Sequence, residues 1–170
     1  MPTDFDPAIV YQWGMRYDAF FARARKLIQA HWNESGTFNE VLGFHPHHQI
    51  YRNAERMGAL HILTAWSDGE LVGYMTLFIL DHPRDVTVKL VKDDVIYVRP
   101  DFRKFKVGWR MLELALERCE PYRAQGPLIL NLRDKDHTGA YLERMGFELV
   151  ERVYGKILPK SLSQPQEKVA

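Results

Sequence analysis

The sequence has little that would tie it to a membrane, an oxidising compartment or a polyanion. Cys119 is its single cysteine, so the chain cannot close an internal disulfide, which fits a reducing compartment. No apolar run is long enough to span a bilayer, and residues 1–6 show no signal-peptide pattern. The formal net charge of +1 argues against a general binder of nucleic acid. These absences predict a cytoplasmic protein with no membrane partner.

The composition that remains is that of one ordinary globular domain. Hydrophobic residues make up 46% and charged residues 26% of the chain, and 170 residues are enough to bury a core. From Pro159 onward the sequence is polar and has few residues that can pack. We therefore expect a single domain over residues 1–158 and a disordered tail over residues 159–170.

One stretch, residues 93–119, organises the rest of the chain. Its run from Val95 to Val98 predicts a buried strand, which Pro100 ends because proline cannot donate to a sheet ladder. A basic loop and a helix from Val107 follow, and the start of a helix offers N–H groups and a positive dipole end to phosphate. Apolar residues at helical spacing predict the buried stripe of that helix, at Met111, Leu112, Ala115, Leu116 and Cys119. Because Cys119 lies in this stripe, an inert buried thiol is favoured over a nucleophile.

The remaining elements alternate around this stretch. Further strands are predicted at Ile9–Gln12, Leu60–Trp66, Leu71–Leu80, Leu128–Leu132 and Phe147–Leu158, and further helices at 18–31, Tyr51–Met57 and Thr138–Met145. Residues 86–91 alternate and fit either an extension of a strand or an edge segment. A hairpin followed by a β-α-β-α-β order indicates an α/β fold, with a sheet of mixed direction and helices on its faces.

Two segments resemble the GNAT superfamily of N-acetyltransferases. The first is similar to its acyl-CoA-binding segment V-x-P-x-Y-R-G-x-G-x-G and reads Val98-x-Pro100-x-Phe102-Arg103-x-x-x-x-Gly108. The second is similar to a late A-x-x-Y-E-x-x-G-F element and reads Ala140-Tyr141-Leu142-Glu143-Arg144-Met145-Gly146-Phe147. The spacing between them also fits, and the resemblance extends to about Leu158.

Within the superfamily the chain most resembles small proteins encoded by bacteriophages. That resemblance rests on three short runs, which are His31-Trp32, Asp93-Asp94-Val95 and Leu142-Glu143-Arg144-Met145-Gly146-Phe147 with Glu151-Arg152-Val153-Tyr154. It implies that the cell is a bacterium or a phage-infected host.

The resemblance implies a GNAT fold, in which two parallel strands of a mixed central sheet splay apart and admit the pantetheine arm of acetyl-CoA. It implies cofactor contacts from the central strand, the loop and the next strand, at Ile96, Tyr97, Val98, Arg103, Lys104, Phe105, Lys106, Val107, Gly108, Trp109, Arg110 and Asn131. Gly108 lets the backbone approach phosphate without a Cβ. The chain departs from the pattern where Lys104 and Lys106 replace two glycines; the alternative interpretation is a solvated basic loop.

The implied reaction is the attack of an amine on a thioester. Because an alkyl amine has a pKa of about 10.4, a base must take a proton, and the oxyanion must be stabilised, in this family by backbone N–H near Tyr97 or Val98. Asp94 is the first candidate for the base, on the same strand face as Ile96; alternatively Asp93 and Asp94 form a turn before the strand. Glu34 is the second candidate, and its alternative is a surface acid at a helix end.

The position that carries the general acid in many GNAT enzymes is Leu142 here. Tyr141 is adjacent, but one helical residue turns a side chain by roughly 100°, which favours a packing role. Solvent or another tyrosine would then protonate the thiolate, which is already a fair leaving group because the pKa of a thiol is about 8.5. Three histidines lie close together in the sequence, at His45, His47 and His48. Their spacing does not match a metal site, so no metal is expected there. Together with Trp32 and Tyr51 they fit either the wall of an acceptor site or a packed loop.

The sequence thus favours an acetyltransferase that moves acetyl from acetyl-CoA to an amine in a ternary complex. The acceptor is a small amine, a protein amine or a modified base. An alternative is a GNAT-like binding protein without catalysis that contacts a host or phage partner, and a homodimer fits the superfamily. A third hypothesis is nucleic-acid binding by the basic residues Arg99, Arg103, Lys104, Lys106 and Arg110. The small net charge of the chain weakens it.

Overall fold

The computed structural model describes residues 7–35, 43–122, 128–129 and 139–150. The chain divides into two compact units, residues 1–133 and residues 134–170. All five strands that the structure describes lie in the first unit. The second contains one described helix, α4 (Gly139–Arg144). The proposed tail, residues 159–170, lies outside the described residues.

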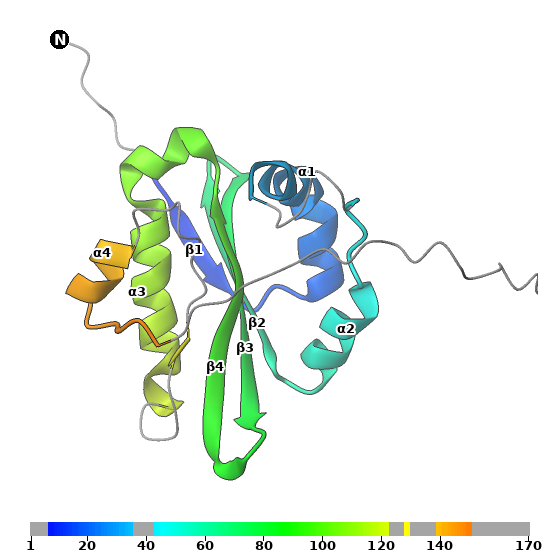
Figure 1. Ribbon diagram of the computed structural model, residues 1–170. Helices are drawn as coiled ribbons and strands as arrows, with labels where there is room; N and C mark the ends of the chain where they lie inside the picture. Colours follow the sequence, from blue (N-terminus) through cyan, green and yellow to red (C-terminus); the bar gives the residue numbers. More distant parts are fainter. Residues whose placement is uncertain (1–6, 36–42, 123–127, 130–138, 151–170) are drawn as a thin grey trace, which may run out of the picture. The chain divides into compact units, whose positions relative to one another are not determined.

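The first unit is built on a five-stranded sheet in the order β1-β2-β3-β4-β5 (Figure 1). Its first four strands are antiparallel neighbours, and β5 runs parallel to β4. The mixed sheet predicted from the sequence is therefore confirmed. The strands are β1 (Val10–Trp13), β2 (Leu60–Ser67), β3 (Glu70–His82), β4 (Asp85–Val98) and β5 (Leu128–Ile129).

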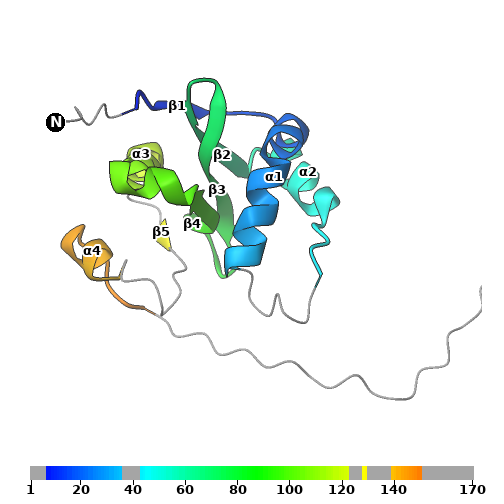
Figure 2. The same ribbon diagram turned by 90° about the horizontal axis from the view of Figure 1, so that it is seen from above.

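Helices cover both faces of this sheet, as expected. Helices α1 (Tyr17–Ser35) and α2 (His48–Arg56) lie on one side and α3 (Val107–Cys119) on the other, which Figures 1 and 2 show from two directions. The α1 side buries a largely aromatic cluster of Tyr17, Phe20, Ala24, Ile62, Tyr74 and Tyr97. On the other side the predicted stripe of α3 is buried, at Met111, Leu112, Ala115 and Cys119, and Leu116 is half-buried.

Strand β4 differs most from the prediction. It is one strand of 14 residues, so residues 86–91 are an extension of it, and Asp93 and Asp94 lie inside it. The alternative that these two residues form a turn before the strand is wrong. Thr76 pairs with Val95 while Leu77 pairs with Asp93, so Asp94 is the extra residue of a β-bulge.

Two further segments depart from the sequence prediction. The basic loop forms a 3₁₀-helix, η1 (Pro100–Phe105), with Pro100 at its start, where a missing N–H costs nothing. Residues 147–150 are not a strand, and the rest of the strand predicted at Phe147–Leu158 lies outside the described residues. A second short 3₁₀-helix, η2 (Glu120–Tyr122), follows α3.

Candidate active site

The turn between η1 and α3 presents backbone N–H groups at one end of the sheet. Lys106 joins the two elements in the left-handed conformation, at φ 58° and ψ 23°. The first hydrogen bond of α3 runs from the N–H of Arg110 to the carbonyl of Lys106, at 3.1 Å. Within an α-helix the N–H groups of the first turn have no carbonyl partner, and a lysine cap cannot accept from them. The start of α3 therefore has the backbone geometry of an anion site.

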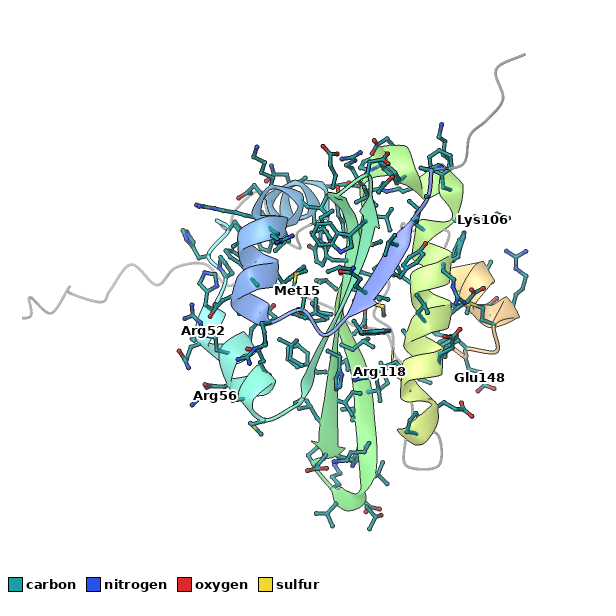
Figure 3. The ribbon with its side chains drawn as sticks, turned by 180° about the vertical axis from the view of Figure 1, so that it is seen from behind. Met15, Arg52, Arg56, Lys106, Arg118 and Glu148 are labelled. Carbon is teal, nitrogen blue, oxygen red and sulfur yellow. The ribbon has the colours of Figure 1, made fainter. Side chains whose placement is uncertain are left out.

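Gly108 lies in this first turn and packs against the end of β4. A Cβ built on it would lie 3.6 Å from Cγ2 of Val98, an ordinary contact. The two lysines that replace glycines of the resembled pattern, Lys104 and Lys106, are both exposed. The Lys106 side chain points outward from the N-terminal end of α3 (Figure 3). Neither lysine side chain is buried across the turn.

The arginines of this region are paired with carboxylates. Arg110 contacts Glu113 at 3.0 Å and Glu117 at 3.1 Å, on its own helix. Arg99 contacts Glu70 at 3.0 Å and Asp101 at 2.8 Å. These pairs reduce the positive field that the sequence suggested for nucleic acid.

The edge of β4 that faces away from β3 carries backbone groups of Ile96 and Val98. The N–H of Arg99 donates to the carbonyl of Val72 on β3, at 2.8 Å. Because antiparallel neighbours alternate in direction, Val98 and Ile96 point their N–H groups to the opposite edge. On that edge, Leu128 and Ile129 of β5 pair with Val91 and Lys92, respectively, which precede Ile96 along β4. Asn131 lies outside the described residues.

This alternation distinguishes the two predicted oxyanion partners. Tyr97 forms a cross-strand pair with Tyr74, and its backbone groups point toward β3. The backbone of Val98 points to the other edge, where its carbonyl accepts a hydrogen bond from Nε of Arg103 at 3.0 Å. Val98, rather than Tyr97, therefore offers an N–H on the side where the sequence analysis expects the cofactor.

The bulge turns Asp94 onto the α1 side of the sheet. Its Oδ2 accepts hydrogen bonds from the Tyr51 hydroxyl at 2.9 Å and from Oγ1 of Thr76 at 3.2 Å. Thr76 lies on the same sheet face as Tyr74, which packs against α1. The expectation that Asp94 shares a face with Ile96 is thus wrong, because an extra residue shifts the alternation by one. Asp94 is exposed, with its carboxylate held by two hydroxyls.

Glu34 lies at the end of α1 and reaches the same strand. It accepts a hydrogen bond from the Tyr97 hydroxyl at 2.9 Å and pairs with Nη2 of Arg103 at 2.7 Å. Burial alone would raise the pKa of Glu34, but the hydrogen bonds from Arg103 and Tyr97 outweigh it and hold that pKa below its ordinary value. Glu34 is therefore an ionised, partnered carboxylate beside Tyr97 and not an isolated surface acid.

An aromatic network joins these groups beneath α1. The ring of His31 stacks on Tyr97 at 4.5 Å, and its Nδ1 lies 2.7 Å from the Tyr74 hydroxyl. Burial raises the pKa of the Tyr97 hydroxyl, and its hydrogen bond to Glu34 raises it further. Burial also raises the pKa of the Tyr74 hydroxyl, so the hydroxyls of Tyr97 and Tyr74 both stay protonated at neutral pH.

A second stacked pair lies beside Asp94. Tyr17 stacks on Tyr51 at 4.9 Å with ring planes 3° apart, and its hydroxyl lies 2.8 Å from Nδ1 of His48. Burial is the main cause that raises the pKa of Tyr17 to about 12, and it also raises that of Tyr51, with Asp94 adding to it. The sequence singled out Tyr51 and His48 for the acceptor wall, but not Tyr17 or Tyr74. Only the register of β3 against β4 and the course of α1 place those two.

Residues 24–147 match the description "Acetyltransferase (GNAT) family". The chain belongs to the GNAT family. Solved GNAT-like structures agree in fold. A ribosomal-protein-alanine N-acetyltransferase from Brucella melitensis biovar Abortus 2308 is 18% identical, with a TM-score of 0.62 over 89% of this chain and 100% of that one. No curated protein sequence matches the chain.

Two further GNAT-fold structures show how widely the similarity extends. A glucosamine-6-phosphate N-acetyltransferase from Arabidopsis thaliana is 12% identical, with a TM-score of 0.64, covering 88% of this chain and 99% of that one. An aminoglycoside acetyltransferase from an uncultured soil metagenomic sample, in complex with sisomicin, is 11% identical, with a TM-score of 0.63, covering 88% and 97%. At these identities the likeness shows the GNAT fold alone.

The remaining predicted positions of this GNAT chain are Leu142, Tyr141, His45, His47 and Trp32. Leu142, at the usual acid position, is buried on α4, and the side chain of Tyr141 lies outside the description. His45 and His47 are exposed, while Trp32 contacts Phe44 at 5.8 Å between ring centres. Among the described residues, no group of three His, Cys, Asp or Glu side chains is arranged to hold a metal, and no described helix is long and apolar enough to cross a membrane.

Proposed function

We propose that this GNAT protein moves an acetyl group from acetyl-CoA to an amine acceptor, by direct attack in a ternary complex. The observation that carries the proposal is the sequence of a strand end, a tight turn and a helix start at residues 98–108, with Gly108 in the first helical turn. Family membership supports the same reaction class.

The cofactor's diphosphate would bind at the start of α3, at the N–H groups of its first turn around Gly108, with Lys104 and Lys106 nearby in the chain. The other implied contacts around this turn are Arg103, Phe105, Val107, Trp109 and Arg110. Its pantetheine arm would follow the edge of β4 that carries Ile96 and Val98, and Asn131, outside the described residues, is a further contact that the family resemblance implies. These residues fit the group, since backbone donors and cations occur at the expected end of the sheet.

The chemical step needs a base on the acceptor side. Asp94 would take a proton from the acceptor's ammonium, since its carboxylate is exposed and held by Tyr51 and Thr76. The amine nitrogen then bonds to the thioester carbon, the oxyanion accepts from the N–H of Val98, and the C–S bond breaks as the tetrahedral intermediate collapses. A second proton leaves the nitrogen, and solvent protonates the thiolate, because Leu142 cannot.

The acceptor is a small amine, a protein amine or an amine of a modified base. The named activities of the similar structures concern a ribosomal protein, a sugar phosphate and aminoglycosides, and they differ from one another. We also propose that the chain belongs with the phage-encoded GNAT proteins and acts in the cytoplasm of a bacterium or an infected host, where a homodimer fits the family.

The test is isothermal titration of the protein with acetyl-CoA, for the wild type and for Gly108→Trp. We expect wild-type binding in the micromolar range and none for Gly108→Trp, since an indole would stand in the first turn of α3. Absence of wild-type binding at millimolar cofactor would contradict the proposal. The alternative, a GNAT-like binding protein that contacts a host or phage partner, is supported by Leu142 at the acid position. It gains if Gly108→Trp keeps the full biological effect.

A further inference from the structure

A cation already contacts both the Glu34 carboxylate and the Tyr97 ring, and it belongs to the chain itself. The guanidinium of Arg103 is 2.7 Å from the Glu34 carboxylate, and its central carbon lies 5.5 Å from the centre of the Tyr97 ring. The Tyr97 hydroxyl fixes the same carboxylate at 2.9 Å. The carboxylate at the hydroxyl end of the ring and the face of the ring therefore hold one organic cation together.

Arg103 also lies at the place proposed for the cofactor. It belongs to η1, three residues before Lys106 and the start of α3. A guanidinium binds phosphate oxygens in a bidentate manner, which suits a diphosphate better than a single carboxylate. Its pair with Glu34 is weak and easily exchanged, because 45% of the Arg103 side chain and 41% of the Glu34 side chain are exposed.

We propose that Arg103 exchanges Glu34 for the cofactor's diphosphate, and that the vacated site, against the Glu34 carboxylate and over the Tyr97 ring, then receives the cationic amine of the acceptor. The inference rests on the proposed function and adds to it a substrate class and an order of binding. The acceptor is a positively charged primary amine, and it binds well only after the cofactor.

The electrostatics of Glu34 agree with this exchange. Burial acts to raise the pKa of Glu34, whereas Arg103 and Tyr97, with a smaller contribution from His31, lower it. Departure of the guanidinium removes the strongest of the lowering contacts. The carboxylate is then a better partner for an ammonium group, since it has lost its competing cation.

The test is titration of the full chain with coenzyme A, which binds without turnover. In Glu34→Gln the arginine has no competing carboxylate, so we expect binding about two- to fivefold tighter than in the wild type. In Arg103→Ala we expect weaker binding, and in the double variant no tightening relative to Arg103→Ala. Glu70→Gln, which removes the exposed partner of Arg99, is the matched control and should bind as the wild type does.

The outcomes separate this inference from the proposed function. If the wild type does not bind coenzyme A, the proposed function fails. If it binds but Glu34→Gln is unchanged or weaker, only the exchange is wrong. If Glu34→Gln tightens binding equally with and without Arg103, the effect is general charge removal, which also overturns the exchange.

The acceptor site is tested by NMR of carbon-13-labelled tyrosine, with ethylammonium chloride as the probe and Tyr97→Phe to assign the signal. The Tyr97 ring signal should move with ethylammonium in the wild type only when coenzyme A is present, and in Arg103→Ala without it. Arg103→Ala with Glu34→Gln should show no movement. An equal response of the wild type with and without coenzyme A, or no response in any protein, would overturn the assignment of this site.

Discussion

The hydroxyl of Tyr51 donates a 2.9 Å hydrogen bond to Oδ2 of Asp94. The two residues come from α2 and from the bulge of β4, 43 positions apart, and Thr76 supplies a second hydroxyl to the same oxygen. The carboxylate is thus oriented by neutral donors through one of its oxygens, and the described residues donate no hydrogen bond to the other.

Replacing this carboxylate tests its role as a base. Asp94→Asn keeps the shape and removes the proton acceptor, so we expect kcat to fall about 10²- to 10⁴-fold with coenzyme A binding unchanged. The measurement is thiol release from acetyl-CoA with the most active member of a panel of primary amines. Asp81→Asn, at the far end of the β3–β4 hairpin, is the control and should keep full kcat. An active Asp94→Asn would assign the proton transfer to another group.

The left-handed conformation of Lys106 should limit stability. A side chain in this region costs about 1 kcal/mol relative to glycine, so Lys106→Gly should raise the free energy of unfolding by about 0.5–1 kcal/mol in urea denaturation. Lys104→Gly removes the same charge within η1, where φ is negative, and should lower it by a similar amount. Equal effects of the two changes would mean that charge, not backbone conformation, decides.

Gly108 separates stability from cofactor binding. Its Cβ would meet Val98 at an ordinary 3.6 Å, and alanine favours a helix over glycine by about 1 kcal/mol, so Gly108→Ala should not lower the melting temperature. The methyl group would nevertheless stand where the diphosphate approaches, so we expect coenzyme A affinity to fall about tenfold or more. Gly139→Ala, at the start of α4, is the matched control and should leave affinity unchanged.

His61 should make stability depend on pH. Burial, together with Arg118, whose Nη2 lies 3.3 Å from the His61 ring, lowers the pKa of His61 in the folded protein. The unfolded chain therefore binds a proton more readily, and the stability that His61 provides is present above about pH 6.5 and is lost as the pH falls through the folded value.

The corresponding measurement is urea denaturation at pH 7 and at pH 5. The free energy of unfolding should decrease more for the wild type than for His61→Gln, which stays neutral. His47→Gln, on the exposed segment before α2, should follow the wild type. Parallel decreases in the wild type and His61→Gln would show that other groups cause the acid sensitivity.

Local patterns predicted most of the secondary structure. The stripe from Met111 to Cys119 placed α3 correctly, and the apolar run of residues 71–80 placed β3, because a helical stripe and a buried run are properties of short segments. The sequence also located the turn before Gly108, where proline and glycine mark the ends of elements.

What the sequence missed depends on contacts across the chain. The pairs of Glu34 with Arg103 and of His31 with Tyr74 join α1 to residues more than 40 positions away. The bulge at Asp94 follows from the register of two long strands, and no residue type in the sequence predicts it. The site residues were therefore predicted by family resemblance, and their partners could not be.

The inserted residue in β4 divides that strand into two halves of opposite parity. Before it, odd-numbered residues such as Val91 and Asp93 lie on the side of α3, and after it Val95 and Tyr97 lie on the side of α1. Odd-numbered side chains of this one strand therefore pack on opposite faces of the sheet before and after the bulge. Deleting residue 94 would make Asp93 and Val95 consecutive opposite Leu77 and Thr76, so the strand would alternate regularly and both halves would keep their faces. The chain would then lose the carboxylate at this place in the sheet while the hydrophobic core and the aromatic cluster stayed in position.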